Sequence, residues 1–312
     1  MPTETGSGRT RGRAVFYIAV LAYLICAGSW VCAEEAVPEA AGTPGAFSER
    51  MKLEGKLESN PFSITTYKRN YLLPLSYNAS PNRRTTSDVG DTVDHAEVEF
   101  QVSLQFPLVN SLWKENGRLF LAYTNHSWWQ AYNSDASSPF RETNHEPELM
   151  LAIRTDQRIF GFDAKSFTFG LVHQSNGRSG TLSRSWNRVQ GYFIFERGRL
   201  VLALCPWYRI PEEAKTGPDD SSGDDNPDLE RYLGYGELTA VYKLGEQTLG
   251  MVWRNNLRAE GNKGAIEIDW SFPLAGRFKG YVKYFNGYGE SLVDYNASSN
   301  RIGVGLLFSD LL

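Results

Sequence analysis

The sequence predicts an all-β protein, a transmembrane barrel of about twelve antiparallel strands. Three observations lead to this prediction. Apolar and polar residues alternate along segments of about ten residues. The connections between these segments are alternately short and long, and aromatic residues make up 13% of the chain. A tilted strand that crosses a bilayer needs about 9–11 residues, whereas most strands have about 5–6. Alternating faces and aromatic girdles are typical of transmembrane barrels.

Residues 1–33 have the features of a cleaved export signal. Three arginines precede an apolar run over 14–31, and Val31 and Ala33 are small enough for cleavage before Glu34. A retained transmembrane helix is the alternative, because the run is close to the length of about 18 residues that spanning requires. The arginines, the terminal position and the acidic residues after Ala33 favour cleavage. Cleavage would move the net charge from −4 to about −6, so no basic face for nucleic acid is expected.

Residues 34–60, rich in Ala, Glu, Gly and Lys, are expected to form a loose periplasmic arm before a barrel domain over 61–312. Of the three cysteines, only Cys205 lies beyond the signal. We therefore expect no internal disulfide, although an exported protein reaches a compartment that permits one.

The strands are predicted from a period of two. Over 95–108 one face carries Val98, Phe100, Val102, Leu104 and Phe106, and the other face is polar. Over 264–274 the apolar face carries Ile266, Ile268, Trp270 and Phe272. The same pattern predicts strands near 61–77, 95–108, 118–132, 144–155, 162–175, 186–196, 199–210, 232–244, 247–257, 264–274, 278–287 and 300–312.

The connections alternate in length. Short turns near 196–198, 244–246 and 275–277 are interleaved with longer polar segments at 79–94, 133–143, 176–185, 211–231 and 288–299. Short turns on one side and long loops on the other are the outer-membrane arrangement. An even strand number places both termini on the short-turn, periplasmic side. A soluble sandwich or a lipocalin-like barrel is the alternative.

The fifth predicted strand carries polar residues on the face that should contact lipid. Phe167, Phe169 and Leu171 share this face, and the next two positions on it are His173 and Ser175. Residues at i and i+2 project to the same side with Cα atoms roughly 6.5–7 Å apart, so the imidazole can act as a base for the hydroxyl. Polar groups beside lipid are costly, which indicates a functional reason for them.

Asn187, at the start of the neighbouring strand, has the parity and the position to orient the His173 ring. An amide suits this role because it places no carboxylate beside hydrocarbon. A His-x-Ser pair also occurs in strands without a catalytic role, and Ser175 is not in a G-x-S-x-G turn. Spacing alone therefore leaves both interpretations open.

Three sequence blocks carry a resemblance to a known family. They are HQSNGRS at 173–179 continued by SRSWNR at 183–188, SSPFRETN at 137–144, and DDNPD at 224–228. In this order and spacing they closely resemble the signature of bacterial outer membrane phospholipase A, and the likeness covers most of residues 61–312. The resemblance implies a twelve-stranded barrel that hydrolyses the sn-1 and sn-2 acyl esters of phospholipids and lysophospholipids. It also implies a dormant monomer that becomes active as a homodimer when phospholipid reaches the outer leaflet.

The resemblance also implies roles for individual residues. Ser175 would be the nucleophile, His173 the general base and Asn187 the residue that orients His173. The amide of Gly177 and calcium-bound water would stabilise the oxyanion. The remaining assignments are Ca²⁺ ligands in the dimer (Ser183, the main-chain carbonyl of Arg178, and Ser137 of the partner subunit), Asp225 as a further calcium position in the monomer, and Asn125 in the dimer interface.

The long loop after Ser175 places the site at the outer-leaflet side of the membrane. The segment around 211–223 departs from the family pattern because it is expanded and acidic. Two other functions remain open. One is a barrel without catalysis, serving as a pore or scaffold, and the other is a lipid acyltransferase or deacylase that uses the same site.

Overall fold

The structure is a computed structural model that describes residues 45–57, 63–83, 93–113, 116–217, 220, 223–276 and 278–312. The predicted export signal and the first part of the predicted arm lie outside the described residues. Pro44–Leu312 form one compact unit, which contains the barrel.

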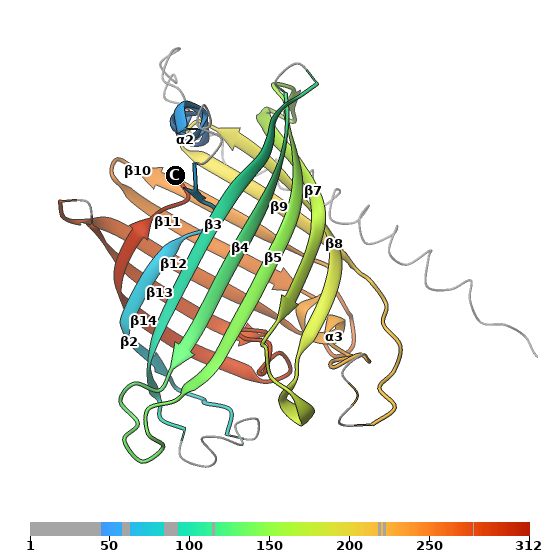
Figure 1. The fold of residues 1–312 in the computed structure, drawn as a ribbon. Helices are drawn as coiled ribbons and strands as arrows, with labels where there is room; N and C mark the ends of the chain where they lie inside the picture. The colour runs from blue at the N-terminus through green and yellow to red at the C-terminus, as the bar shows by residue number, and fades with distance from the viewer. Residues whose placement is uncertain are drawn as a thin grey trace, which may run out of the picture. The chain divides into compact units, whose positions relative to one another are not determined.

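Twelve long strands form a closed antiparallel barrel, as the sequence predicts (Figure 1). Each strand pairs with the next in the chain, and the last pairs with the first. The strands are β2 Asn70–Asn78, β3 Ala96–Leu112, β4 Gly117–Trp129, β5 Phe140–Arg154, β7 Phe162–Ser175, β8 Ser185–Arg197, β9 Leu200–Arg209, β10 Gly236–Leu244, β11 Gln247–Asn255, β12 Gly264–Ala275, β13 Phe278–Tyr288 and β14 Ser298–Ser309. Two short strands, β1 (Thr65–Thr66) and β6 (Arg158–Ile159), pair with β3 and β7.

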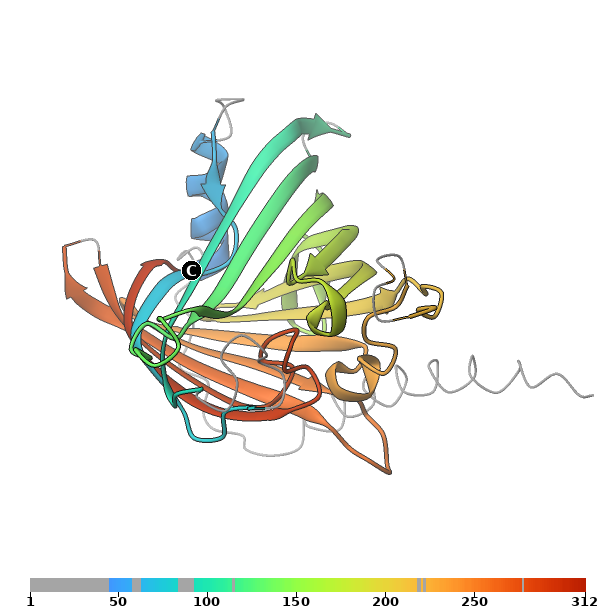
Figure 2. The same cartoon turned by 60° about the horizontal axis from the view of Figure 1, so that its bottom comes forward.

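The connections alternate in length around the barrel. The connections β3–β4, β8–β9, β10–β11 and β12–β13 have two to four residues, and β5–β7 includes β6. The longer ones are at 79–95, 130–139, 176–184, 210–235, 256–263 and 289–297, and they lie at the other end. Helix α3 (Glu230–Leu233) lies at this end and helix α2 (Ala46–Leu57) at the opposite end (Figures 1 and 2).

The two faces of the strands differ as a membrane barrel requires. Along β7, Thr168 and Val172 are buried inside, whereas Phe169 and Leu171 are 43% and 54% exposed on the outside. Every long strand from β2 to β14 carries at least one exposed large apolar or aromatic side chain. An outward apolar band is what lipid contact demands. No helix among the described residues has the length and apolarity needed to span a bilayer.

Charged side chains fill the barrel interior near the long connections. Glu97 on β3 pairs with Arg141 on β5 (2.6 Å) and with Arg301 on β14 (2.7 Å). Arg301 also pairs with Glu290 (2.7 Å), and Arg141 pairs with Asp294 of the β13–β14 connection. Buried charges are tolerated when they are paired in this way. The chain of ion pairs links β3, β5 and β14 to the β13–β14 connection, so charged side chains are buried at this end of the barrel.

The first strand begins later than predicted. The sequence predicts a strand over 61–77, but β2 starts at Asn70, because the residues just before it bind inside the barrel. Lys68 pairs with Glu148 (2.9 Å) and Arg69 with Asp269 (2.9 Å). These two cations satisfy buried carboxylates and interrupt the strand between β1, which still pairs with β3, and β2.

The described part of the predicted loose arm is an ordered helix. The buried carboxylate of Glu196 accepts hydrogen bonds from the Phe47 amide (2.6 Å) and the Ser48 hydroxyl (2.6 Å) at the start of α2. A carboxylate at a helix N-terminus is favourable. Arg50 donates to the Leu311 carbonyl (2.7 Å), so α2 is held against both β8 and the C-terminal residues.

Candidate active site

The predicted base and its orienting residue are directly paired on the outside of the barrel. In the register of β7 and β8, His173 lies opposite Asn187 and Ser175 opposite Ser185. His173 is exposed, and its Nδ1 is 2.8 Å from Asn187 Oδ1. In the part of the chain that the structure describes, no hydrogen bond joins Ser175 to His173. The base is therefore oriented, and the nucleophile lies two residues away on the same face of β7.

A second imidazole adjoins the predicted nucleophile. His145 on β5 is the register partner of Ser175 on β7, and Asn125 on β4 is the register partner of His145. His145 Nδ1 is 2.7 Å from the Tyr123 hydroxyl. A Cβ placed on Gly177 would lie 3.8 Å from His145 Cδ2, so the ring borders the space beside Gly177. Sequence reasoning assigned His145 no role, because its proximity to Ser175 depends on the register between two strands.

The outward polar side chains of these strands form one continuous surface. We call this surface the outer wall, and its residues are Asn125, His145, His173, Ser175 and Asn187. Neighbouring strands of a sheet lie about 4.8 Å apart, so residues in register on β4, β5, β7 and β8 form a row across the barrel surface. Residues from four strands therefore contribute to one site on the outer wall.

The loop after Ser175 is held by a buried amide. Asn176 Oδ1 accepts hydrogen bonds from the Arg184 amide (3.0 Å) and the Arg178 amide (3.3 Å), and its Nδ2 donates to the Leu182 carbonyl (2.9 Å). Gly177, with φ +64°, can take the left-handed conformation that the turn needs. Sequence reasoning missed the positioning role of Asn176, although the residue stands inside the HQSNGRS block.

Two of the residues predicted to bind calcium meet in this structure. The hydroxyls of Ser183 and Ser185 donate to Asp225 Oδ2 at 2.9 and 3.1 Å. The other carboxylate oxygen, Oδ1, is 2.5 Å from Lys215 Nζ. Asp225 belongs to the β9–β10 connection and the serines to the β7–β8 hairpin, so the contact joins two loops.

The other two predicted calcium residues lie in different places. Arg178 is in the same loop as Ser183, and its side chain donates to the Arg141 carbonyl (2.6 Å) at the start of β5. Ser137 is exposed in the β4–β5 connection, with φ +59°. It therefore lies on a different loop from Ser183 and Arg178, and its role as a ligand from a partner subunit stays a prediction.

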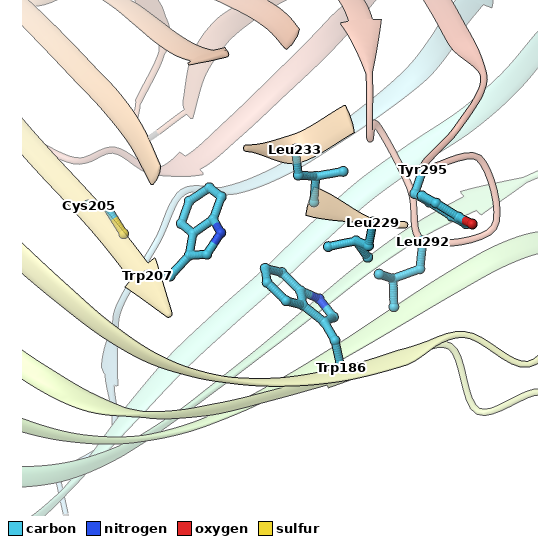
Figure 3. Packing of buried hydrophobic residues seen from close by; sticks show 7 residues of the cluster. All are labelled: Trp186, Cys205, Trp207, Leu229, Leu233, Leu292 and Tyr295. Atoms are coloured by element: carbon cyan, nitrogen blue, oxygen red, sulfur yellow. The ribbon is translucent and has the colours of Figure 1, made fainter. Parts of the chain in front are cut away.

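A hydrophobic cluster supports the start of β8 from inside the barrel (Figure 3). Trp186, beside Asn187, packs edge-on against Trp207 with ring centroids 6.0 Å apart. Leu233 from α3 belongs to the same buried cluster, and Tyr295 donates to Asp228 (2.7 Å). Burial and this hydrogen bond raise the pKa of the Tyr295 hydroxyl above its usual range, so the hydroxyl stays a neutral donor.

A glutamate that sequence reasoning missed lies behind Asn187. Asn187 Nδ2 donates to Glu212 Oε1 at 2.8 Å. Glu212 comes from the β9–β10 connection, which is the expanded segment of the sequence. No local pattern could have indicated this contact, because it joins a strand to an irregular loop 25 residues away.

The fold is that of a bacterial outer-membrane barrel, and a histidine paired with an asparagine beside a serine is the arrangement of a serine hydrolase. A family model described as phospholipase A1 matches residues 47–308. The chain belongs to the phospholipase A1 family.

Similar proteins agree with this assignment. Phospholipase A1 of Klebsiella pneumoniae is 38% identical over 254 residues, which cover 81% of this chain and 84% of the relative. A putative phospholipase A1 of Neisseria meningitidis is 40% identical over 273 residues, covering 83% and 66%.

Solved structures of the family superpose on the barrel. Outer membrane phospholipase A from Escherichia coli matches with a TM-score of 0.74 and 38% identity, covering 81% of this chain and 94% of that chain. An active-site mutant of the same protein, with an asparagine replaced by alanine, has a TM-score of 0.73. The calcium-bound dimer of the Salmonella typhi outer membrane phospholipase has a TM-score of 0.76 and 37% identity, covering 86% and 100%. The chain is therefore a phospholipase and an outer-membrane barrel protein.

Proposed function

We propose that this chain is a calcium-dependent phospholipase that cleaves both the sn-1 and the sn-2 acyl esters of phospholipids and lysophospholipids. The observation that carries the proposal is the hydrogen bond between His173 and Asn187 on the outer wall, two residues from Ser175. Lipid is the class of substrate that reaches such a surface within a membrane. The site lies at the end of the barrel with the long connections, which supports a position at the outer-leaflet side.

The proposed reaction passes through an acyl-enzyme. His173 Nε2 removes the proton from Ser175 Oγ while the oxygen attacks the ester carbonyl carbon. The amide of Gly177 donates to the oxyanion that forms. His173 then gives the proton to the departing lysophospholipid oxygen. In the second half of the reaction, His173 removes a proton from water as the water oxygen attacks the acyl-enzyme, and the proton returns to Ser175 Oγ when the fatty acid leaves. Asn187 keeps the ring of His173 oriented throughout, and the asparagine in the active site of the E. coli relative supports this role.

The loop residues fit a calcium ion chemically. Calcium prefers hard oxygen ligands. The Ser183 hydroxyl, the Arg178 carbonyl and Ser137 of the partner subunit would supply them in a dimer, and Asp225 would supply a carboxylate in the monomer. Asp225 accepts hydrogen bonds from two serine hydroxyls and pairs with the ammonium group of Lys215, so a cation is favourable at this position. When bound, calcium would lower the energy of the developing oxyanion through its charge.

Lys215 occupies the carboxylate that we assign to calcium, and its removal should tighten calcium binding. Lys215 Nζ is 2.5 Å from Asp225 Oδ1, so an incoming ion has to displace the ammonium group. Lys215→Met is expected to lower the calcium Kd about fivefold, which corresponds to roughly 1 kcal/mol. Isothermal titration calorimetry in detergent would measure this change. Lys243→Met is a matched control, because Lys243 pairs with Glu49 instead. An unchanged Kd for Lys215→Met would contradict the assignment of Asp225.

A homodimer is proposed as the active form. The related Salmonella typhi protein is a dimer with bound calcium. His145, the register partner of Ser175, and Asn125, the register partner of His145, both lie on the outer wall, where lipid is a poor partner for polar groups. A second copy that covers this face would bring Ser137 of the partner subunit to the calcium residues.

Product analysis tests the proposed function against its alternatives. Fatty-acid release from mixed phospholipid–detergent micelles is expected in the presence of calcium, from both acyl positions. A new acylated lipid in place of free fatty acid would identify an acyltransferase. Absence of both products from a folded dimer would support a scaffold or pore, although the buried ion pairs at one end of the barrel disfavour an open pore.

A further inference from the structure

Asn187 has hydrogen bonds on both ends of its side-chain amide. One end is 2.8 Å from His173 Nδ1, and the other is 2.8 Å from Glu212 Oε1. The three side chains form one line from the β9–β10 connection to the imidazole. This line continues toward Ser175, which lies two residues from His173 on the same face of β7.

Glu212 determines which way the amide points. A carboxylate can only accept hydrogen bonds, so the NH₂ group of Asn187 has to face Glu212 and Oδ1 has to face His173. Oδ1 also only accepts, so His173 carries its proton on Nδ1. The lone pair of Nε2 is then left to accept the proton of Ser175. Without Glu212, the amide could rotate and present NH₂ to Nδ1, which would select the unreactive tautomer.

The backbone near Glu212 is held in place on both sides. The Ile210 amide donates to the Asn187 carbonyl at 2.8 Å, and the Asp224 amide donates to the Glu213 carbonyl at 2.7 Å. Asp224 in turn pairs with Arg209 at the end of β9 (2.5 Å). The residues on either side of Glu212 are therefore anchored to the strands β8 and β9.

We propose that Glu212 is a positioning residue that fixes the amide orientation of Asn187 and thereby the tautomer of His173. The inference rests on the proposed function, because it assigns His173 as the general base. Glu212 would extend the set of Ser175, His173 and Asn187 by one residue, which comes from the expanded loop.

The first experiment removes Glu212 alone. Glu212→Ala is expected to lower kcat about 10- to 100-fold, the range typical of lost outer-shell hydrogen bonds, with little change in KM. Glu212→Gln keeps an acceptor atom and should retain more activity. Glu213→Ala is the matched control, because Glu213 is an exposed neighbour on the same loop. In an Asn187→Ala background, removing Glu212 should have no further effect, since nothing remains for it to orient.

The second experiment exchanges the two groups. Asn187→Asp should lose activity, because its new carboxylate lies beside Glu212 and the like charges repel each other. Adding Glu212→Gln to Asn187→Asp should restore part of kcat, since the glutamine amide can donate to the new carboxylate while that carboxylate still accepts from His173. A purely structural role for Glu212 predicts the opposite, a second loss on top of the first.

Folding and chemistry are separated by two further readouts. Heat-modifiable migration on gels reports the folded barrel. The rate at which a sulfonyl fluoride labels Ser175 reports the reactivity of the nucleophile, and it should fall in Glu212→Ala and recover in Asn187→Asp/Glu212→Gln. An equal loss from Glu212→Ala with and without Asn187, or no recovery in the exchanged pair, would overturn the inference. If the wild-type protein releases no fatty acid at all, the proposed function fails instead.

Discussion

Ser175→Ala is expected to reduce calcium-dependent fatty-acid release by about 10⁴-fold or more, as loss of the nucleophile does in other serine hydrolases. The alanine side chain has no oxygen to attack the ester, and the nearest serine in register cannot replace it. That serine is Ser185, whose hydroxyl donates to Asp225. The measurement is fatty-acid release from mixed micelles at saturating calcium, with wild type and variant side by side.

A serine in the same loop provides the control. Ser179 is exposed and its side chain makes no capping hydrogen bond, so Ser179→Ala should leave the rate unchanged. Heat-modifiable migration should be the same for both variants, because neither side chain contributes to the packing of the barrel interior. Substantial residual activity in folded Ser175→Ala would remove Ser175 from the mechanism and return attention to His145 and the other polar residues of the outer wall.

The barrel and the central pair of the site could be predicted because both follow from short-range periodicity. Strand β7 occupies 162–175 as predicted, since a period of two fixes which residues share a face and the turn residues mark its ends. The same periodicity placed His173 and Ser175 together on the outside. Antiparallel pairing across a single loop then made Asn187 a reasonable partner, and the structure pairs it with His173.

Other parts of the site depend on contacts that periodicity does not encode. Glu212 and Lys215 lie in an irregular loop, and their contacts with Asn187 and Asp225 depend on how that loop folds back. The position of His145 depends on the register between β5 and β7, which is set by the whole barrel. The late start of β2 has the same origin, because the charges on the two residues before it have partners only once the barrel interior exists.

Removal of calcium is expected to lower the rate of fatty-acid release about 10²–10³-fold, the scale of losing one main oxyanion-stabilising interaction. The physical reason is that the positive charge of calcium no longer stabilises the oxyanion. The oxyanion would form beside the amide of Gly177 alone, on a lipid-facing surface where a negative charge has little solvation. Chelation of the purified dimer, followed by fatty-acid release with increasing free calcium, would measure both the loss and its recovery.

Magnesium is the informative comparison for this prediction. Magnesium requires a compact octahedral shell and gives up water reluctantly, whereas hydroxyl and carbonyl ligands from separate loops suit calcium. The Ser183 hydroxyl and the Arg178 carbonyl come from the loop 176–184, and Ser137 of the partner subunit comes from another, so we expect magnesium to restore little activity. Full recovery with magnesium, or a rate that chelation leaves unchanged, would show that these loop oxygens do not form a calcium site and that the oxyanion is stabilised by protein groups alone.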